Sequence, residues 1–326
     1  MKIVITGGAG FIGLMLARRL LGETEVYGPD GRATGIDEIE LFDQAIPTER
    51  PAGLDARVRF TAGEISDKDA LRRLMNRADI GVYHLASVVS GGGERDFDLA
   101  MRVNLTAHID LLEAARALGS RPRMVFASSI AVFGGDAMPR IVGDDTKQTP
   151  QTTYGMTKAI GELLINDYSR KGFIDGRAAR LPTVIIRPGK PNAAASSFAS
   201  GVFREPLNGV DCVLPVAEDT VMPVAGYRTI VEGLVKIYQA DGAALGSDRA
   251  INLPSIDVSV AEMIAALKRA AAGCKLGAIR VERDPAIERI VATWPVKADF
   301  ERALALGLPR DPDLESIIRA YIADFL

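Results

Sequence analysis

The sequence predicts an α/β fold built on a doubly wound parallel sheet, with a smaller lobe toward its C-terminal end. Six short apolar runs rich in β-branched residues alternate with helical patterns over roughly the first 190 of 326 residues. The connections between them are long enough for parallel pairing. Beyond that point, loop-like segments with short apolar runs take over. We therefore expect one domain over residues 1–190, rejoined by about 226–253, and a lobe over 191–326 that covers the carboxyl ends of the strands, where such sheets bind ligands.

The N-terminus carries the clearest local pattern, a strand that breaks into a glycine-rich turn and then a helix. Gly7, Gly10 and Gly13 follow the β-branched run 2–6, and an apolar period of about 3.6 residues continues from there to residue 21. Gly7 allows a tight turn, Gly10 lets backbone N–H groups approach a pyrophosphate, and Gly13 lets the helix pack closely on the sheet. Because a helix N-terminus favours an anion, the stretch predicts a dinucleotide-binding turn of a Rossmann domain, with an ordinary structural turn as the alternative.

The later elements follow from the same analysis of apolar periods. Residues 23–36 carry three glycines and a proline without a sustained period, so we expect an inserted surface loop. Ser66 and Asp69 have capping-box spacing before a helix that extends to residue 78, and one long helix is expected over 94–118 with Asn104 in its apolar middle. The other expected elements are strands 38–42, 58–61, 80–86, 123–127, 183–187 and 251–253, and helices 229–239, 260–271 and 314–325.

Composition excludes several classes of function. The net charge is −3, with 48% hydrophobic and 25% charged residues, which argues against nucleic acid or an anionic membrane as the main partner. No apolar stretch approaches the roughly 18 residues of a membrane span, and no cleavable signal pattern is present. Cys212 and Cys274 lie far apart, and His84 and His108 are the only histidines. We therefore expect reduced thiols, a cytoplasmic location and no metal site.

Acidic residues near the second strand bear on the choice of dinucleotide. Asp43 follows strand 38–42, where a carboxylate can bind the adenine-ribose hydroxyls and repel a 2′-phosphate, so the expected cofactor is NAD. Its distance from the glycine turn is longer than usual, which the inserted loop explains. Asp30, after the shorter run Val26–Tyr27, is the alternative. The expected cofactor contacts are Gly7, Gly10, Phe11, Ile12, Asp43, Glu64, Ile65, Leu85, Ala86, Tyr154, Lys158 and Pro188.

A serine, a tyrosine and a lysine add reaction chemistry to this frame. Ser129 follows strand 123–127, and Tyr154 and Lys158 are four residues apart in a helical pattern, so their head groups share one helix face. A phenol with a pKa of about 10 is a weak base at neutral pH, but an adjacent ammonium group favours the phenolate. Ser129 would then hydrogen-bond a substrate oxygen and orient its carbon toward a nicotinamide.

In this combination the sequence resembles the extended branch of the short-chain dehydrogenase/reductase superfamily, which includes nucleotide-sugar epimerases. The resemblance rests on residues 6–13, 128–129 and 154–158, and it covers roughly the first 190 residues. It implies an NAD-dependent enzyme, and a homodimer is the family-level expectation.

The family pattern also implies a role for each of four residues. Tyr154 would be the acid/base, and Lys158 would activate it and anchor the cofactor. Ser129 would hold the substrate oxygen, and Asn104 would hold a water that relays protons.

A narrower resemblance, to the D-erythronate dehydrogenase group within that branch, rests on residues 187–198 and 204–207 and on the inserted loop. It implies oxidation of a small sugar acid, D-erythronate, at its 2-hydroxyl. The substrate carboxylate needs a cation or backbone donors, for which Lys190 and Arg204 are the candidates, although each is otherwise a plain surface cation. The expected substrate contacts are Ser87, Ser129, Lys190, Asn192 and Arg204.

Two other functions stay open at this point. A nucleotide-diphosphate-sugar epimerase or dehydratase would use the same tyrosine, lysine and bound NAD. Residues 190–326 contain no recognisable uridine pocket or diphosphate clamp, and Ile130 and Ala131 stand where a dehydratase has an acidic pair. A non-catalytic redox sensor would bind the dinucleotide without needing Ser129, Tyr154 and Lys158 together.

Overall fold

The computed structural model describes residues 1–191 and 194–326, and its central layer is a sheet of seven strands. The strands are β1 (Lys2–Thr6), β4 (Glu38–Asp43), β5 (Val58–Ala62), β6 (Ile80–His84), β7 (Arg123–Ser129), β8 (Asp175–Leu181) and β12 (Ala250–Asn252). Their order is β12-β8-β7-β6-β1-β4-β5, and every pairing is parallel. Because the order runs outward from β1 in both directions, the sheet is doubly wound, as the sequence predicts.

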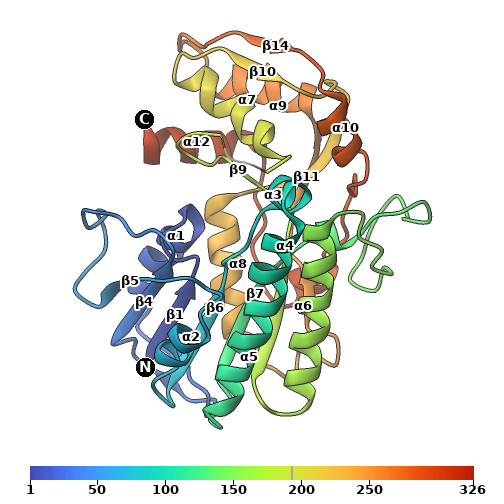
Figure 1. The fold of residues 1–326 in the computed structure, drawn as a ribbon. Helices are drawn as coiled ribbons and strands as arrows, with labels where there is room; N and C mark the ends of the chain where they lie inside the picture. Colours follow the sequence, from blue (N-terminus) through green and yellow to red (C-terminus); the bar gives the residue numbers. More distant parts are fainter. Residues whose placement is uncertain (192–193) are drawn as a thin grey trace.

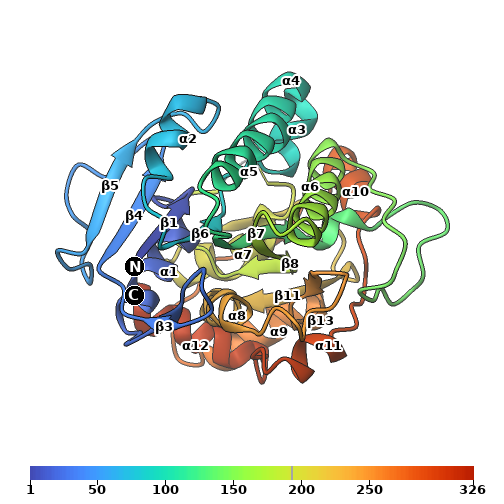
Figure 2. The same cartoon turned by 90° about the horizontal axis from the view of Figure 1, so that it is seen from below.

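Helices cover both faces of this sheet, which lies between them as the middle layer (Figure 2). The helices are α1 (Phe11–Leu21) and α8 (Tyr227–Gln239) on one face, and α2 (Lys68–Leu74), α5 (Ala107–Ala117) and α6 (Thr153–Arg170) on the other. Side chains alternate along each strand, so Ile3 and Ile5 pack with α1 and α8 while Val4 packs with α2 and α5. Burial on both faces explains why these strands are nearly continuous apolar runs.

A smaller lobe with its own apolar core lies beyond the carboxyl ends of the strands (Figure 1). It contains two small sheets. One consists of β13 (Ile256–Ser259), β11 (Val221–Gly226) and β9 (Thr183–Ile185), and the other consists of β10 (Cys212–Leu214) and β14 (Ile279–Val281). The helices of the lobe are α7 (Ser197–Leu207), α9 (Val260–Ala270), α10 (Pro285–Val291) and α12 (Leu314–Phe325). The short helix α11 (Glu301–Ala305) returns to the main sheet beside β12. At the end of α12, Phe325 packs on Phe11, with ring centroids 6.0 Å apart.

The strand expected over 183–187 is not part of the main sheet. It forms β9, which pairs with β11, and the sixth main-sheet strand along the chain is β8. This part of the prediction is wrong because β8 carries buried charges. Arg177 is fully buried and Arg180 is 2% exposed, but Asp175 and Glu162 pair with them at 3.3 Å and 2.8 Å. A strand with such partners can be buried without being apolar.

Three local features also differ from the expectation. The helix expected over 94–118 consists of α3 (Ser90–Arg95), α4 (Phe97–Ala100), a π-helical turn (Met101–Thr106) and α5. Asp67 rather than Ser66 caps α2, because its carboxylate accepts hydrogen bonds from the N–H groups of Asp69 and Ala70 at 2.9 Å and 3.2 Å. The loop 23–36 includes a short hairpin of β2 (Val26–Tyr27) and β3 (Ala33–Thr34).

Candidate active site

The glycine turn has a geometry that excludes side chains at Gly7 and Gly13. Gly7 has φ +69°, and a Cβ added to it would lie 2.8 Å from the backbone nitrogen of Ala86. A Cβ on Gly13 would lie 2.6 Å from the carbonyl oxygens of Gly7 and Gly8. Gly10 begins α1 without a side-chain cap, so the first N–H groups of this helix remain available to a phosphate. The turn therefore fits the pyrophosphate of a dinucleotide.

The structure places Asp43 beside this turn and Asp30 far from it. An oxygen of the Asp43 carboxylate accepts a hydrogen bond from the backbone N–H of Ala9 at 3.1 Å. Asp30 lies in the exposed hairpin, at a surface hollow with Arg123 and Asp175, which begin strands β7 and β8. That hollow is at the amino ends of the parallel strands, the edge opposite to the glycine turn. Of the two candidates, only Asp43 is near enough to the turn to contact a nucleotide bound there.

The other expected cofactor contacts have different surroundings. Ile12 and Leu85 line the cavity described below. The backbone N–H of Ala86 donates to the Thr6 hydroxyl at 3.3 Å, which joins the ends of β1 and β6. Phe11 packs on Tyr227, Ile65 is buried in the sheet core, Glu64 is exposed, and Pro188 is half-buried after β9.

Tyr154 and Lys158 lie one turn apart near the start of α6, beside the end of β7. The Thr152 hydroxyl caps the helix by accepting from Gly155 N–H at 3.0 Å. A Cβ on Gly155 would lie 2.1 Å from the Ala131 carbonyl oxygen, so this glycine permits the close approach of α6 to the β7 end. The Lys158 ammonium donates to the Ala127 carbonyl at 2.7 Å and lies 5.4 Å from the centroid of the Tyr154 ring.

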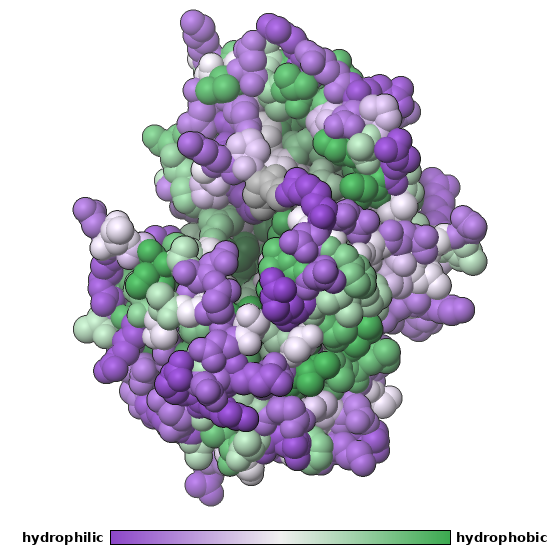
Figure 3. All heavy atoms as spheres, viewed as in Figure 1, coloured by the Kyte–Doolittle hydropathy of each residue, from purple (hydrophilic) through white to green (hydrophobic). Residues whose placement is uncertain are grey.

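These residues border a cavity of about 250 Å³ between the sheet layer and the smaller lobe. Its lining includes Ser129, Tyr154 and Lys158 from the sheet layer, and Arg187 and Trp294 from segments of the lobe. The surface is hollowed between the two layers, with apolar side chains deep in the hollow (Figure 3). The structure thus brings the three predicted catalytic residues to one wall and leaves room for a small ligand against them.

Burial and neighbouring groups shift both pKa values at this wall. Burial lowers the pKa of Lys158 to about 7, and the negative charge of Glu162 opposes that shift. Burial raises the pKa of Tyr154, and a hydrogen bond with the Ser129 hydroxyl opposes that shift. The two pKa values therefore lie farther apart than in free solution, where they are nearly equal, and burial on its own favours the neutral amine beside the neutral phenol.

Asn104, in the π-helical turn, holds the loop after β6 against α6. Its side-chain amide exchanges two hydrogen bonds with the backbone of Val88, at 2.7 Å and 3.0 Å. The Ser87 hydroxyl donates to its oxygen at 3.2 Å, and its NH₂ group donates to the Thr157 hydroxyl at 3.4 Å. The π-helical turn aims this amide at the loop. Ser87, which we predicted to contact the substrate, is thus hydrogen-bonded to Asn104 in this structure.

Besides Lys158, the cavity is lined by the cation Arg187, which we did not predict from the sequence as a substrate contact. Lys190 is exposed and does not line it. Arg204 is buried within α7, where it donates to the Arg187 carbonyl at 2.9 Å and pairs with Glu205. The predicted contact Asn192 lies outside the described residues. Burial and the nearby Arg204 charge lower the pKa of Arg187, so an anion in the cavity would stabilise its guanidinium.

Two features that would indicate other functions are absent from residues 1–191 and 194–326. These residues contain no group of three or more His, Cys, Asp or Glu side chains that could hold a metal ion. None of their helices has both the length and the apolar character needed to cross a membrane.

Comparison with known proteins gives the family. Residues 3–245 match the NAD dependent epimerase/dehydratase family. The chain is 50% identical over 325 residues to D-erythronate dehydrogenase of Cupriavidus necator, covering 99% of this chain and 98% of that one. It is 41% identical over 322 residues to D-erythronate dehydrogenase of Haemophilus influenzae, covering 99% of each. Among solved structures, the nucleoside-diphosphate-sugar epimerase from Agrobacterium tumefaciens has a TM-score of 0.90 at 39% identity, covering 100% of this chain and 94% of that one.

These matches confirm the predicted fold class and the predicted resemblance to the extended branch. The dehydrogenase relatives also confirm the predicted enzyme class, an oxidoreductase that acts on a CH–OH group. The chain belongs to the NAD-dependent epimerase/dehydratase family.

Proposed function

We propose that the protein oxidises the 2-hydroxyl of a small sugar acid with NAD, converting D-erythronate to 2-dehydro-D-erythronate. Family membership and the relatives give a nicotinamide cofactor and a small-molecule substrate, and the choice of NAD and of this acid is our proposal. The observation that carries it is that Ser129, Tyr154, Lys158 and Arg187 border one cavity. The first three groups suit oxidation of an alcohol, and the arginine suits a carboxylate.

Each residue at the cavity wall has a defined role in this proposal. A bound nicotinamide would supply the acceptor for the hydride that leaves the substrate carbon. The Tyr154 phenolate takes the proton of the substrate hydroxyl, and the Lys158 ammonium stabilises that phenolate. The Ser129 hydroxyl donates a hydrogen bond to the substrate oxygen and orients it. Asn104 fixes the loop at Val88 and thereby the neighbouring wall of the cavity.

In this proposal the main sheet domain binds the cofactor, and the smaller lobe contributes to the substrate site. Residues 1–190 with about 226–253 form the NAD-binding domain, except for β9 and Arg187, which belong to the smaller lobe. The N–H groups at the start of α1 hold the pyrophosphate, and Asp43 holds the adenine ribose. Residues 191–326 mainly form the substrate lobe, which adds Trp294 to the cavity. A homodimer and a cytoplasmic location stay predictions.

The size of the cavity favours a small acid over a nucleotide sugar. Pockets for drug-sized ligands occupy about 300–1,000 Å³, and this cavity of about 250 Å³ would also have to admit the nicotinamide. A four-carbon acid fits the remaining space better than a nucleoside diphosphate sugar. The epimerase alternative is therefore the second candidate, supported by the structural match to a nucleoside-diphosphate-sugar epimerase.

A panel of substrates tests this function directly. We expect D-erythronate to reduce NAD, with a preference over NADP of about tenfold or more. Repulsion between the Asp43 carboxylate and the 2′-phosphate of NADP need be worth only about 1.4 kcal/mol to give that factor. The measurement is the absorbance of the reduced cofactor. A four-carbon acid without a 2-hydroxyl should be inactive. Interconversion of a UDP-hexose, with no oxidation of any four-carbon acid, would reject the dehydrogenase proposal in favour of the epimerase.

Arg187 gives a second test, on substrate binding. Arg187→Gln should raise the KM for the sugar acid by about 10- to 100-fold, the equivalent of a charged hydrogen bond of about 1.5–3 kcal/mol. The change in kcat should be much smaller, because the carboxylate is held equally before and during the reaction. Arg319→Gln, on the exposed face of α12, is the matched control. An increased KM in Lys190→Gln, with none in Arg187→Gln, would transfer the role to Lys190.

A further inference from the structure

Glu162 lies one turn beyond Lys158 on α6 and is tied into a buried ion pair. Both carboxylate oxygens accept from the Arg180 guanidinium, at distances of 2.8–3.1 Å. The Ser128 hydroxyl and the Gln148 amide donate to the same carboxylate. Glu162 and Arg180 are each 2% exposed. Spacing of four residues places Glu162 on the helix face that carries Lys158 and, one turn earlier, Tyr154.

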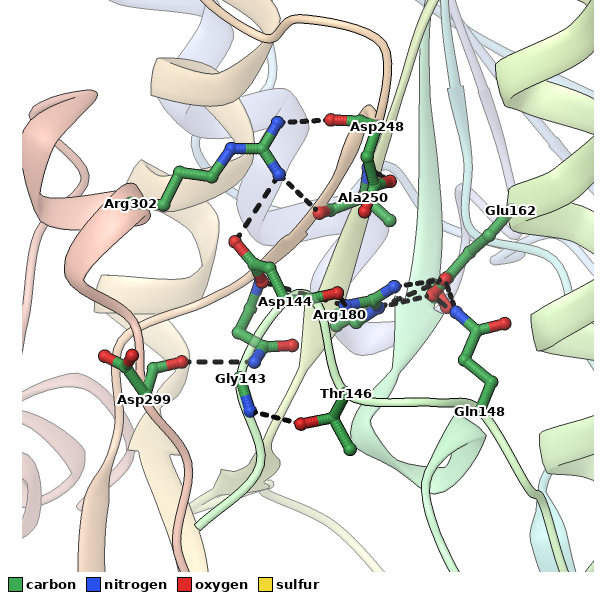
Figure 4. A network of polar contacts seen from close by, with 12 residues as sticks. Gly143, Asp144, Thr146, Gln148, Glu162, Arg180, Asp248, Ala250, Asp299 and Arg302 are labelled. Carbon is green, nitrogen blue, oxygen red and sulfur yellow. Dashed lines mark hydrogen bonds and ion pairs between the residues drawn. The ribbon is translucent and has the colours of Figure 1, made fainter. Parts of the chain in front are cut away.

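The pair belongs to a network that fixes Arg180 from its other side (Figure 4). The Arg180 guanidinium donates to the Asp144 carbonyl at 3.0 Å and lies 3.7 Å from the Asp144 carboxylate. That carboxylate accepts from Asn252 N–H at 2.7 Å and pairs with Arg302 at 3.6 Å. The network therefore connects α6, β8, β12 and α11 through the loop that carries Asp144. Its hydrogen bonds to charged groups hold the Glu162 carboxylate in one position.

We propose that Glu162, held by Arg180, is a positioning residue that keeps the Lys158 amine protonated beside Tyr154. The inference rests on the proposed function, because it concerns the proton that Tyr154 and Lys158 share. Glu162 touches neither the substrate nor the cofactor, and it acts through the charge that it presents to Lys158.

The surroundings of Lys158 explain why one carboxylate matters. From β7, the ammonium meets the Ala127 carbonyl at 2.7 Å and the Phe126 ring at 4.8 Å. From β6 and α5, it faces the imidazoles of His84 and His108, whose pKa values are lowered by burial and by the Lys158 charge. On α6 itself the titratable neighbours are Tyr154 and Glu162. Among the neighbours of Lys158 named here, Glu162 is the one carboxylate, and its negative charge offsets part of the free-energy cost of burying the ammonium.

Loss of that charge would redistribute a proton without changing the number of protons. With one proton on the pair, the ammonium and phenolate form exchanges with the neutral amine and phenol form. A negative charge nearer to Lys158 than to Tyr154 favours the first form, which is the one able to accept a proton from the substrate. Without the charge, the population of the neutral amine and phenol form increases. The pKa at which the ammonium and phenol pair loses its first proton also becomes lower.

The test is the pH profile of kcat in Glu162→Gln, with NAD and the sugar acid that the panel identifies. We expect the limiting rate to fall about tenfold and the acid limb to move about one pH unit lower, because loss of one unlike charge at an effective dielectric constant of about 20 lowers the pKa of an amine by roughly one to two units. A second readout uses the protein without cofactor. Cyanate carbamylates neutral amines, so the pH dependence of Lys158 carbamylation, followed by mass spectrometry, should shift downward by a similar amount.

Two controls separate this role from a structural one. Asp167→Asn, which removes an exposed ion pair with Arg170 from the same helix, should leave both readouts unchanged. If Glu162→Gln does not fold because Arg180 is then uncompensated, Glu162→Gln/Arg180→Gln removes both charges and should shift Lys158 carbamylation in the same direction by less. A slower enzyme with an unmoved acid limb and unmoved carbamylation would overturn the inference. Full turnover in Tyr154→Phe would instead reject the proposed function beneath it.

Discussion

Replacement of Tyr154 by phenylalanine should lower kcat for sugar-acid oxidation by about 10²- to 10⁴-fold, the usual contribution of a general acid/base. The phenol is the group at the cavity wall whose proton transfer we expect to accompany hydride removal, and a water molecule would have to replace it. Binding of NAD should be largely kept, because the glycine turn and Asp43 are unchanged. Steady-state rates together with NAD titration by calorimetry measure the two effects separately.

A second tyrosine on the same helix provides the matched control. Tyr168 lies near the other end of α6, where its hydroxyl donates to Glu113. Tyr168→Phe removes one hydrogen bond and should lower the free energy of unfolding by about 1 kcal/mol without changing kcat. Wild-type turnover in Tyr154→Phe would remove Tyr154 from the acid/base role. Loss of NAD binding in that variant would show that its main contribution is to the cofactor site.

Acidification should destabilise the protein through two buried histidines, by about 4 kcal/mol at pH 5. His84 and His108 stack with ring centroids 5.0 Å apart, and both are buried. Burial lowers the pKa of His108 to about 3 and that of His84 well below its usual value. Both rings are thus neutral in the folded protein at pH 5, whereas the unfolded chain binds protons below a pKa of about 6.5. Stability is therefore lost as the pH falls from about 6.5 toward the folded values.

The measurement is the free energy of unfolding in urea at pH 7.5 and pH 5. In His108→Leu, an apolar residue of similar buried character, the difference between the two pH values should shrink by about 2 kcal/mol, half of the effect. His84 is the less suitable site for this substitution, because its Nδ1 atom hydrogen-bonds the Thr6 hydroxyl at 2.7 Å. An unchanged pH dependence in His108→Leu would assign the acid sensitivity to other groups.

The elements predicted correctly from the sequence are those that a local sequence pattern marks. The strand β1, the glycine turn and the helix α1 are marked by a β-branched run, spaced glycines and an apolar period, all within residues 2–21. The strand β8 does not, since its sequence Asp-Gly-Arg-Ala-Ala-Arg-Leu is polar by local criteria. Arg180 is buried there because Glu162 and Asp144 compensate its charge from elsewhere in the chain. Such compensation is invisible to an apolar period.

The candidate site divides in the same way. The four-residue spacing of Tyr154 and Lys158 correctly predicts a shared helix face, because spacing fixes direction within a helix. The role of Arg187 at the cavity was not predicted. Lys190, Arg204 and Arg187 are all cations in the same segment, and only the fold of the lobe determines which of them lines the cavity. One available signal was that Arg187 directly follows a β-branched run and precedes Pro188, as expected for a side chain at a strand end.

The return of the chain into the sheet through α8 and β12 has a consequence for how the protein is made. The edge strand that pairs with β8 comes from residues 250–252, after much of the smaller lobe has been synthesised. An emerging chain that ends before residue 227 lacks both that edge strand and α8, one of the two helices that cover this face of β1. Pairing between strands that are far apart in the sequence gives a fold a high contact order, and a high contact order slows folding. The sheet layer and the lobe are therefore expected to reach their final packing together, after synthesis of the C-terminal third, rather than one after the other.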